Sequence, residues 1–231
     1  MDTLRGLTEL ASTVACSVVI MGETGTGKNL VARRIHEVSR GRGPLVQVAC
    51  PALSNEVVDW RSLLSQARGG SLLLDVVSDL SLPDQDALLN ALRPEAGDPQ
   101  SPAGQVRLLS TTRLDLEPLT RAGRFRDALY LRLASLVIHL PPLRTRLTDL
   151  PELMDSIVAK ASEGGLLPSG RRPRFTQRAL AALAAHPWRG NIRELDNVIQ
   201  RTLIGSSSTS AGESIDEDAV LSALHPVFAL R

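Results

Sequence analysis

The sequence predicts an α/β fold in which a parallel sheet flanked by helices is followed by a smaller, all-helical domain. Three observations predict it. Short apolar runs alternate with helical patterns in the first part of the chain, a glycine-rich turn joins the first run to a helix, and the strand patterns stop after Pro141-Pro142. Strands that alternate with helices are typical of a parallel sheet covered on its faces.

The expected elements follow from hydrophobic periodicity. Leu4, Leu7, Leu10 and Val14 indicate a first amphipathic helix. The expected strands cover 18–21, 45–49, 72–74, 106–110 and 136–140, and helical patterns cover 85–92, 126–133, 150–161, 177–185, 191–204 and about 219–224. We therefore predict an α/β core over residues 1–143 and a helical domain over 144–231.

Composition limits the function classes. The 231 residues are 43% hydrophobic and carry a net charge of +1, which argues against a basic nucleic-acid-binding surface across the whole chain. No long apolar run, export signal or lipidation motif is present, so we expect a cytoplasmic protein without a membrane partner. Cys16 and Cys50 lack metal-ligand spacing and are interpreted as buried thiols, and the four histidines are too scattered for a zinc signature.

The glycine-rich turn, GETGTGKN, predicts a phosphate-binding loop. Its glycines permit backbone conformations closed to other residues, so that successive N–H groups can converge on phosphate oxygens. Lys28 adds a positive charge, and the helix that opens near it offers its positive end to the same anion. The expected nucleotide-binding residues are Gly22, Glu23, Thr24, Gly25, Thr26, Gly27, Lys28 and Asn29. A chance glycine-rich turn is the alternative, and the preceding strand and following helix argue against it.

The residues that end the third apolar run favour nucleotide binding over hydrolysis. Asp75 ends the third apolar run, and Val76 follows it where an ATPase would carry a glutamate. An isopropyl group can neither accept a proton nor hold a water.

Asn29 stands where a P-loop usually has Ser or Thr on Mg²⁺, so metal binding is less firmly indicated than phosphate binding.

Five segments together resemble the central AAA+ domain of bacterial enhancer-binding proteins, the NtrC-like activators of sigma-54 RNA polymerase. They are GETGTGKN, the strand that ends in Asp75, GRFRDALYLRL (123–133), LPPLRTRLTDL (140–150) and HPWRGNIRELDN (186–197). The resemblance covers nearly the whole chain in the same order. It implies a P-loop AAA+ core with a helical lid, and a ring-forming domain with ATP at each subunit interface.

The resemblance also implies roles for individual residues. Asp75 would hold Mg²⁺ through its water shell, and Arg126 and Arg132 match two arginines that reach into a neighbour's nucleotide. Arg193 matches a lid arginine that senses the phosphates, and Thr112 stands at the position of a sensor asparagine. Guanidinium groups suit such tasks because their charge is fixed and their donors fork toward phosphate oxygens. Without the surrounding motif, Arg126 and Arg132 would be interpreted as a solvated helix face.

Several parts of the family pattern are replaced. Val76 replaces the catalytic glutamate, and Ala49 replaces the asparagine that pairs with it as a switch. The segment 51–68 is much shorter than in relatives, and no sequence like their sigma-54-contacting GAFTGA loop occurs. Independent drift is the alternative to one coherent loss of the machinery that converts hydrolysis into work. Base recognition is also in doubt, because the first helix begins the chain.

Three functions remain open. We favour a module that binds ATP or ADP with Mg²⁺, self-associates as a ring or lower oligomer, and controls transcription with weak or no hydrolysis. The alternatives are an active ATPase that drives sigma-54 transcription activation and a nucleotide-independent scaffold or inhibitor of a related activator. A related activator or RNA polymerase is the expected partner, and neither a sensing domain nor a DNA-binding domain is expected within this chain.

Overall fold

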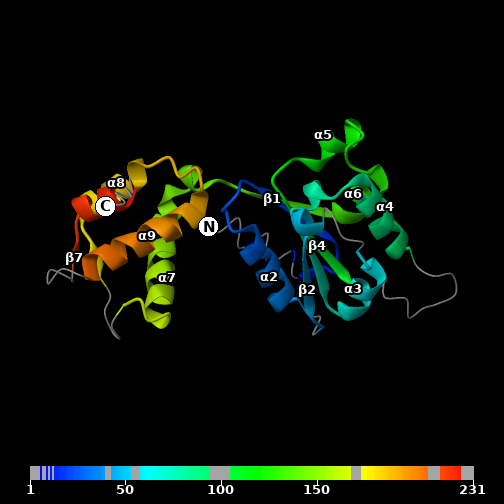
Figure 1. Cartoon of the computed structure of the whole chain (residues 1–231), viewed down its shortest axis with the longest axis horizontal. Helices are drawn as coiled ribbons and strands as arrows, with labels where there is room; N and C mark the ends of the chain where they lie inside the picture. Colours follow the sequence, from blue (N-terminus) through cyan, green and yellow to red (C-terminus); the bar gives the residue numbers. More distant parts are fainter. Residues whose placement is uncertain are drawn as a thin grey trace, which may run out of the picture. The chain divides into compact units, whose positions relative to one another are not determined.

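The chain folds into two units, shown in Figure 1 as drawn from the computed structural model. The structure describes residues 6, 9, 11, 13–39, 43–53, 58–93, 105–167, 173–207 and 214–224. The first unit comprises Met1–Glu23 and Gly27–Leu140, and the second comprises Thr24–Thr26 and Pro141–Arg231. The first expected helix lies mainly outside the described residues, since Leu4, Leu7 and Leu10 are among those left out.

A five-stranded parallel sheet forms the centre of the first unit. Its strands are β1 (Val18–Gly22), β2 (Leu45–Ala49), β3 (Ser71–Asp75), β4 (Arg107–Thr112) and β5 (Leu136–Leu140), in the order β2-β3-β4-β1-β5. The register pairs Val18 of β1 with Leu109 of β4 and with Leu136 of β5. All five predicted strands are confirmed, and the edge strands β2 and β5 are less buried than the three strands between them.

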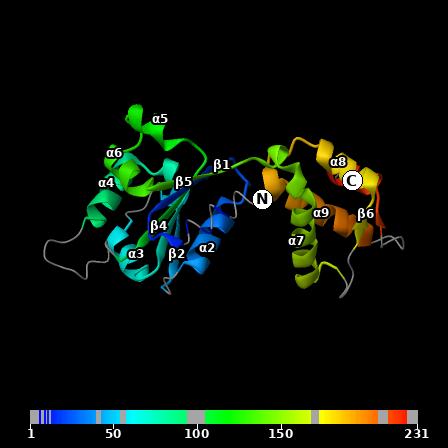
Figure 2. The same ribbon diagram turned by 180° about the vertical axis from the view of Figure 1, so that it is seen from behind.

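Helices cover the two faces of this sheet. They are α2 (Lys28–Val38), α3 (Trp60–Gln66), α4 (Leu82–Ala91), α5 (Leu116–Arg121) and α6 (Asp127–Leu133). Figures 1 and 2 show α2 on one face and α3, α4 and α6 on the other. Side chains of β3 alternate between these layers, since Leu73 packs in the cluster under α2 while Leu72 and Leu74 pack in the opposite cluster. The central strands of the sheet are therefore largely buried on both sides.

The second unit is mainly helical. Its helices are α7 (Leu150–Glu163), α8 (Gln177–Ala185), α9 (Asn191–Ser207) and α10 (Glu217–Leu224), and a two-stranded parallel pair joins β6 (Arg174–Phe175) to β7 (Ser214–Ile215). Their apolar faces share a core that includes Trp188, Leu195 and Ile199. The predicted helices are confirmed. The expectation that no strand follows Pro141-Pro142 is wrong in this one detail, because two-residue strands are too short to show alternation.

Short 3₁₀ segments complete the connections. They are η1 (Cys50–Leu53), η2 (Val77–Asp79), η4 (Leu143–Thr145) and η5 (Leu147–Asp149). No helix among the described residues has both the length and the apolar character needed to cross a membrane.

Candidate nucleotide-binding site

The predicted site lies where the strands of the first unit end. All five strands are parallel, so their carboxyl ends share one edge of the sheet. Gly22 ends β1, Asp75 ends β3 and Thr112 ends β4. Strand β4 lies between β1 and β3 in the sheet. The fold therefore places the loop after β1 at the edge that carries Asp75, which is the edge where α/β sheets bind ligands.

The backbone of the loop has the conformations that the glycines predict. Gly25 has φ 80° and Gly27 has φ 98°, both in the left-handed region. Gly27 is the N-cap of α2. The first turn of this helix has no side-chain cap and contains no acidic residue. The positive end of α2 is therefore available to an anion such as a phosphate group.

Lys28 lies beneath the loop at the start of α2. Its side chain is buried, and Nζ donates hydrogen bonds to the carbonyl oxygens of Gly22 and Glu23, each at 2.8 Å. These bonds fix the ammonium group between the end of β1 and the first loop residue. A buried lysine so placed supplies the positive charge that a P-loop directs at the outer phosphates.

Asp75 forms a polar cluster with Asn29 and Thr111. Its Oδ2 accepts a hydrogen bond from Asn29 Nδ2 at 2.9 Å, and its Oδ1 accepts one from Thr111 Oγ1 at 2.6 Å. Asn29 Oδ1 is buried and has no hydrogen-bond partner. An acceptor left without a partner beside a carboxylate fits a hydrated Mg²⁺, which takes oxygen ligands and retains several waters. These residues can hold the ion that the fold implies.

Val76 follows Asp75 in a conformation that is rare for its residue type. Its φ of 58° and ψ of 56° lie in the left-handed region, which a β-branched residue seldom adopts. The backbone N–H of Val76 donates to Thr111 Oγ1 at 2.9 Å. On the neighbouring strand β2, Ala49 pairs in register with Asp75. The two replaced positions, Val76 and Ala49, thus lie at the ends of adjacent strands beside the Asp75 cluster.

The structure brings Thr111, and not Thr112, into contact with Asp75. Thr112 is fully buried, and its Oγ1 donates to the carbonyl of Leu114 and accepts from the N–H of Leu114. Its hydroxyl therefore closes a local turn, and its role as a sensor stays a prediction. Thr111 was missed because an alternating strand pattern does not show which of two neighbouring threonines faces the site.

Of the two cysteines predicted to be buried thiols, Cys50, which follows β2, is buried, whereas Cys16 is only partly buried. Burial, reinforced by the negative charge of Asp75, raises the pKa of its thiol to about 12. Cys50 is therefore uncharged at neutral pH and packs as a small apolar side chain, as predicted.

The two predicted trans arginines are both engaged with α4. Arg126, the N-cap of α6, binds both carboxylate oxygens of Asp86, and Arg132 Nη2 donates to the carbonyl of Leu92 at 2.8 Å. Arg126 is therefore not a freely solvated side chain. Sequence reasoning missed Asp86, whose pairing with Arg126 depends on the packing of α4 against α6.

The tip of the loop belongs to the second unit. The side chain of Asn191, which begins α9, donates from Nδ2 to the Thr24 carbonyl at 2.9 Å and accepts the N–H of Leu143 at 2.8 Å. The carbonyl of Gly25 accepts N–H bonds from Ile192 at 2.9 Å and from Arg193 at 3.3 Å.

A side chain cannot be added at Gly25 without conflict, because a Cβ there would lie 2.1 Å from the carbonyl oxygen of Gly190. Arg146 Nη2 also donates to the carbonyl of Thr26 at 3.0 Å. Predicted residues Thr24, Gly25, Thr26 and Arg193 are thus brought together.

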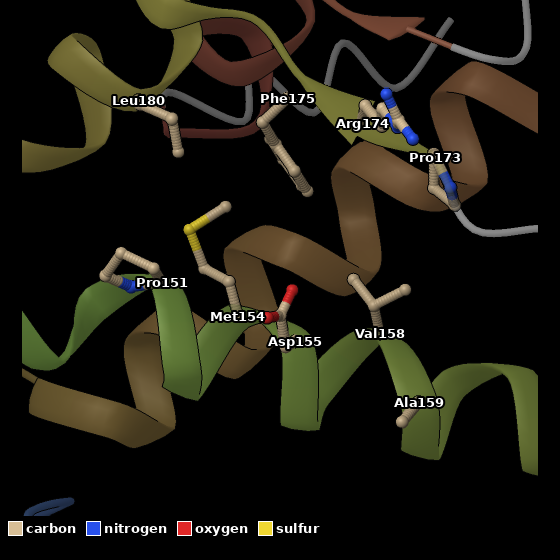
Figure 3. A pocket seen from close by; sticks show the side chains of 9 residues that line it. All are labelled: Pro151, Met154, Asp155, Val158, Ala159, Pro173, Arg174, Phe175 and Leu180. Carbon is tan, nitrogen blue, oxygen red and sulfur yellow. The ribbon is translucent and has the colours of Figure 1, made fainter.

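A hollow of about 450 Å³ lies elsewhere, within the second unit. Figure 3 shows Met154 of α7 and Phe175 of β6 pointing toward each other across it, with Leu180 from α8 at one side. Its remaining lining residues are Pro151, Asp155, Val158, Ala159, Pro173 and Arg174. This mainly apolar hollow contains none of the predicted nucleotide-binding residues.

Family comparisons match the whole of this architecture. Residues 1–143 match the model of the sigma-54 interaction domain, and residues 144–225 match that of the AAA+ ATPase lid domain. The transcriptional regulator AlgB of Pseudomonas syringae is 35% identical over 227 residues, which cover 87% of this chain and 50% of AlgB. NtrC of Rhizobium meliloti is 35% identical over 209 residues, which cover 80% of this chain and 42% of NtrC. The chain spans about half the length of these relatives.

Solved structures give the same result. NtrX from Brucella abortus, in a crystal structure with ATP, has a TM-score of 0.78 and 29% identity, with 97% of this chain and 55% of that chain covered. A second NtrX crystal structure, with ADP, matches equally well with a TM-score of 0.78 and 28% identity over 98% of this chain and 55% of that chain. The RuvB motor of Thermotoga maritima, with a TM-score of 0.67 and 20% identity, over 97% of this chain and 68% of that chain, shares the fold.

Proposed function

Because this chain belongs to the sigma-54 interaction domain family of AAA+ transcriptional regulators, we propose that it is a regulatory module that binds ATP or ADP with Mg²⁺ and hydrolyses ATP weakly or not at all. The single observation that carries the proposal is Val76, which follows Asp75 directly at the end of β3. The conformation of the glycine-rich loop supports binding of a triphosphate, whereas the side chain of Val76 offers no group that could activate water.

Binding is supported by three features of the loop. Gly25 and Gly27 adopt left-handed backbone conformations, α2 begins without a side-chain cap, and Lys28 is buried beneath the loop. Together they provide N–H donors, a helix dipole and a fixed charge for phosphate oxygens. NtrX of Brucella abortus, which shares this fold, crystallises with ATP and with ADP.

Mg²⁺ supplies charge neutralisation and orients the phosphate oxygens when it is bound. Asp75 and Asn29 are the residues of this chain that would hold it, through the carboxylate and the unpartnered amide oxygen. The hydrogen bonds from Asn29 and Thr111 fix the orientation of the Asp75 carboxylate. A fixed carboxylate loses little rotamer freedom when the ion arrives.

The side chains beside Asp75 support weak hydrolysis. Val76 has no proton acceptor, and Ala49 on the adjacent strand has no hydrogen-bonding group. Thr111 already donates to Asp75 and accepts from Val76, so its hydroxyl is committed in both directions. General-base catalysis contributes roughly 10² to 10⁴ in rate, and its loss would leave a slow ATPase nearly inert.

The output of this module would be nucleotide-controlled association. Arg126 and Arg132 would reach a neighbouring copy, and Arg193 would report the phosphates to the lid. No GAFTGA sequence occurs in 51–68 or elsewhere, so the proposed output does not include sigma-54 remodelling by such a loop. A related activator or RNA polymerase in the cytoplasm would be the partner.

Equilibrium titration of a fluorescent ATP analogue, with and without Mg²⁺, tests binding directly. Wild-type protein should show saturable binding that Mg²⁺ strengthens. Lys28→Ala removes a charge-assisted contact and should weaken binding at least about tenfold, since such bonds contribute about 1.5–3 kcal/mol. Lys160→Ala is the matched control, because it removes the chain's other lysine from an exposed position near the end of α7.

The outcome also separates the alternatives. Saturable binding that persists in Lys160→Ala and is lost in Lys28→Ala supports the proposal. A nucleotide-independent scaffold would show no such binding, and that result would overturn it.

A further inference from the structure

Arg126 is held by a bidentate ion pair within its own chain. Its Nε donates to Asp86 Oδ1 at 2.8 Å, and its Nη2 donates to Asp86 Oδ2 at 2.6 Å. Two parallel bonds of this kind fix the plane of a guanidinium group as well as its position. One edge of the Arg126 guanidinium is therefore occupied by a carboxylate from α4.

The backbone N–H of Arg126 is held by Gln85, which precedes Asp86 on α4. Gln85 is fully buried, and its Oε1 accepts the N–H of Arg126 at 2.8 Å. Its Nε2 donates to the carbonyls of Leu80 at 2.9 Å and Arg124 at 3.3 Å. The amide thus fixes where α6 begins, independently of the ion pair, so that the side chain of Arg126 can leave Asp86 without moving the helix.

The two contacts differ in how easily they break. Gln85 is inaccessible to water, whereas the Arg126 and Asp86 side chains are 43% and 48% exposed. Exposed ion pairs are weak and are screened by salt. The ion pair of the Arg126 guanidinium with Asp86 is therefore the contact that breaks more easily. The hydrogen bond of the Arg126 backbone to the buried Gln85 amide is the more stable one.

Asp86 opposes an encounter between Arg126 and a phosphate in two ways. It occupies the Nε and Nη2 donors that a phosphate oxygen pair would use, and its negative charge would lie next to the incoming phosphates. Arg132 differs, because its Nη2 donates to the neutral carbonyl of Leu92.

We propose that Asp86 is a latch that holds Arg126 in its own chain and so raises the threshold for nucleotide-dependent self-association with a second copy. This inference rests on the proposed function, in which Arg126 reaches the nucleotide of a neighbour. Gln85 sets the position of the Arg126 backbone, and Asp86 sets whether the guanidinium is available.

Sedimentation velocity of the full chain at several ATP concentrations tests the latch. Asp86→Asn keeps the shape of the side chain and removes its charge. It should lower the ATP concentration needed for half-maximal association roughly two- to fivefold, as expected for release of an exposed pair. The gain should shrink as salt is raised and should vanish in the Asp86→Asn/Arg126→Ala double variant.

A matched control is available in the same unit. Glu117 pairs with Arg121 at 2.8 Å on α5, also at the surface. Glu117→Gln removes one carboxylate from an exposed arginine pair without touching α4 or α6. It should leave the ATP dependence of association unchanged. An equal shift in both variants would show a general effect of net charge and would overturn the latch.

A nuclear magnetic resonance measurement follows the latch itself. The side-chain N–H resonance of Arg126 Nε, assigned by its loss in Arg126→Lys, should be protected from solvent exchange in wild-type monomer and exposed in Asp86→Asn. Unchanged exchange in the variant would show that the pair does not restrain Arg126 and would contradict the proposal.

The two levels of the argument fail differently. Wild-type protein that binds no ATP analogue would remove the proposed function and the latch with it. Normal ATP binding and ATP-dependent association, with no change in Asp86→Asn, would overturn the latch alone. Weaker association in Asp86→Asn would show that Asp86 supports Arg126 for the encounter, which is the opposite of a latch.

Discussion

At the scale of single residues, the bend after Asp75 is imposed on a side chain that does not favour it. Val76 has φ 58°, and its carbonyl accepts the N–H of Asp79 at 3.0 Å to close the turn that begins η2. A left-handed conformation costs an L-residue about 1–2 kcal/mol, and a β-branched residue is especially unsuited to it. The surrounding hydrogen bonds, rather than the preference of valine, hold this geometry.

Val76→Asn should therefore raise the stability of the protein. Asparagine tolerates the left-handed region, so we expect the free energy of unfolding to increase by about 0.5–1 kcal/mol. Urea denaturation of both proteins measures the difference. The same change at Val137, an exposed valine in the ordinary strand β5, should lower stability instead. A loss of stability at Val76 would show that its conformation is not strained.

The residues proposed to bind phosphate could be identified from the sequence because their chemistry is local in sequence. Gly25, Gly27 and Lys28 lie within one loop whose spacing fixes their roles. Thr111 and Asp86 could not be predicted, because each acts through a partner that is distant in sequence, at Asp75 and Arg126. Such pairings depend on strand register and helix packing, which periodicity does not report.

At the scale of elements, the five strands of the sheet and most helices were predictable, but the short helices α3 and α5 were not. Helix α9 repeats its apolar face over several turns, whereas α3 and α5 have only 7 and 6 residues. Two turns or fewer show little periodicity, so such helices are easily missed, although α6, which also has 7 residues, was predicted. One signal for α3 was present, because Asp59 caps it by accepting the N–H of Ser62 at 3.1 Å.

The turn that starts α9 should be the most sensitive point of the second unit. Asn191 is fully buried, has φ 54°, and bonds through its side chain to Leu143 and Thr24. Asn191→Ala leaves both partners without their bond and places alanine in a left-handed conformation. We expect a loss of about 2–4 kcal/mol in the free energy of unfolding.

Urea denaturation of Asn191→Ala and Asn191→Gly separates the two causes. Glycine accepts the positive φ, so Asn191→Gly should lose only the contribution of the hydrogen bonds and be less destabilised. Wild-type stability in Asn191→Ala would show that these bonds do not support the lid.

At the scale of the whole molecule, the chain consists of a P-loop α/β unit and a helical lid unit. Residues Thr24–Thr26 group with the second unit, and the rest of the loop groups with the first. Binding to the folded state alone stabilises it by RT ln(1 + [L]/Kd), about 2.7 kcal/mol at a hundredfold excess over Kd.

The proposed function requires a site that binds a triphosphate and lacks the groups that activate water. Steady-state phosphate release, measured at an ATP and Mg²⁺ concentration that saturates the same sample, tests this most directly. We predict no release above the level of Lys28→Ala, despite full occupancy. Release at about 1 s⁻¹ or faster that Lys28→Ala abolishes would match an ordinary enzyme turnover and contradict the account.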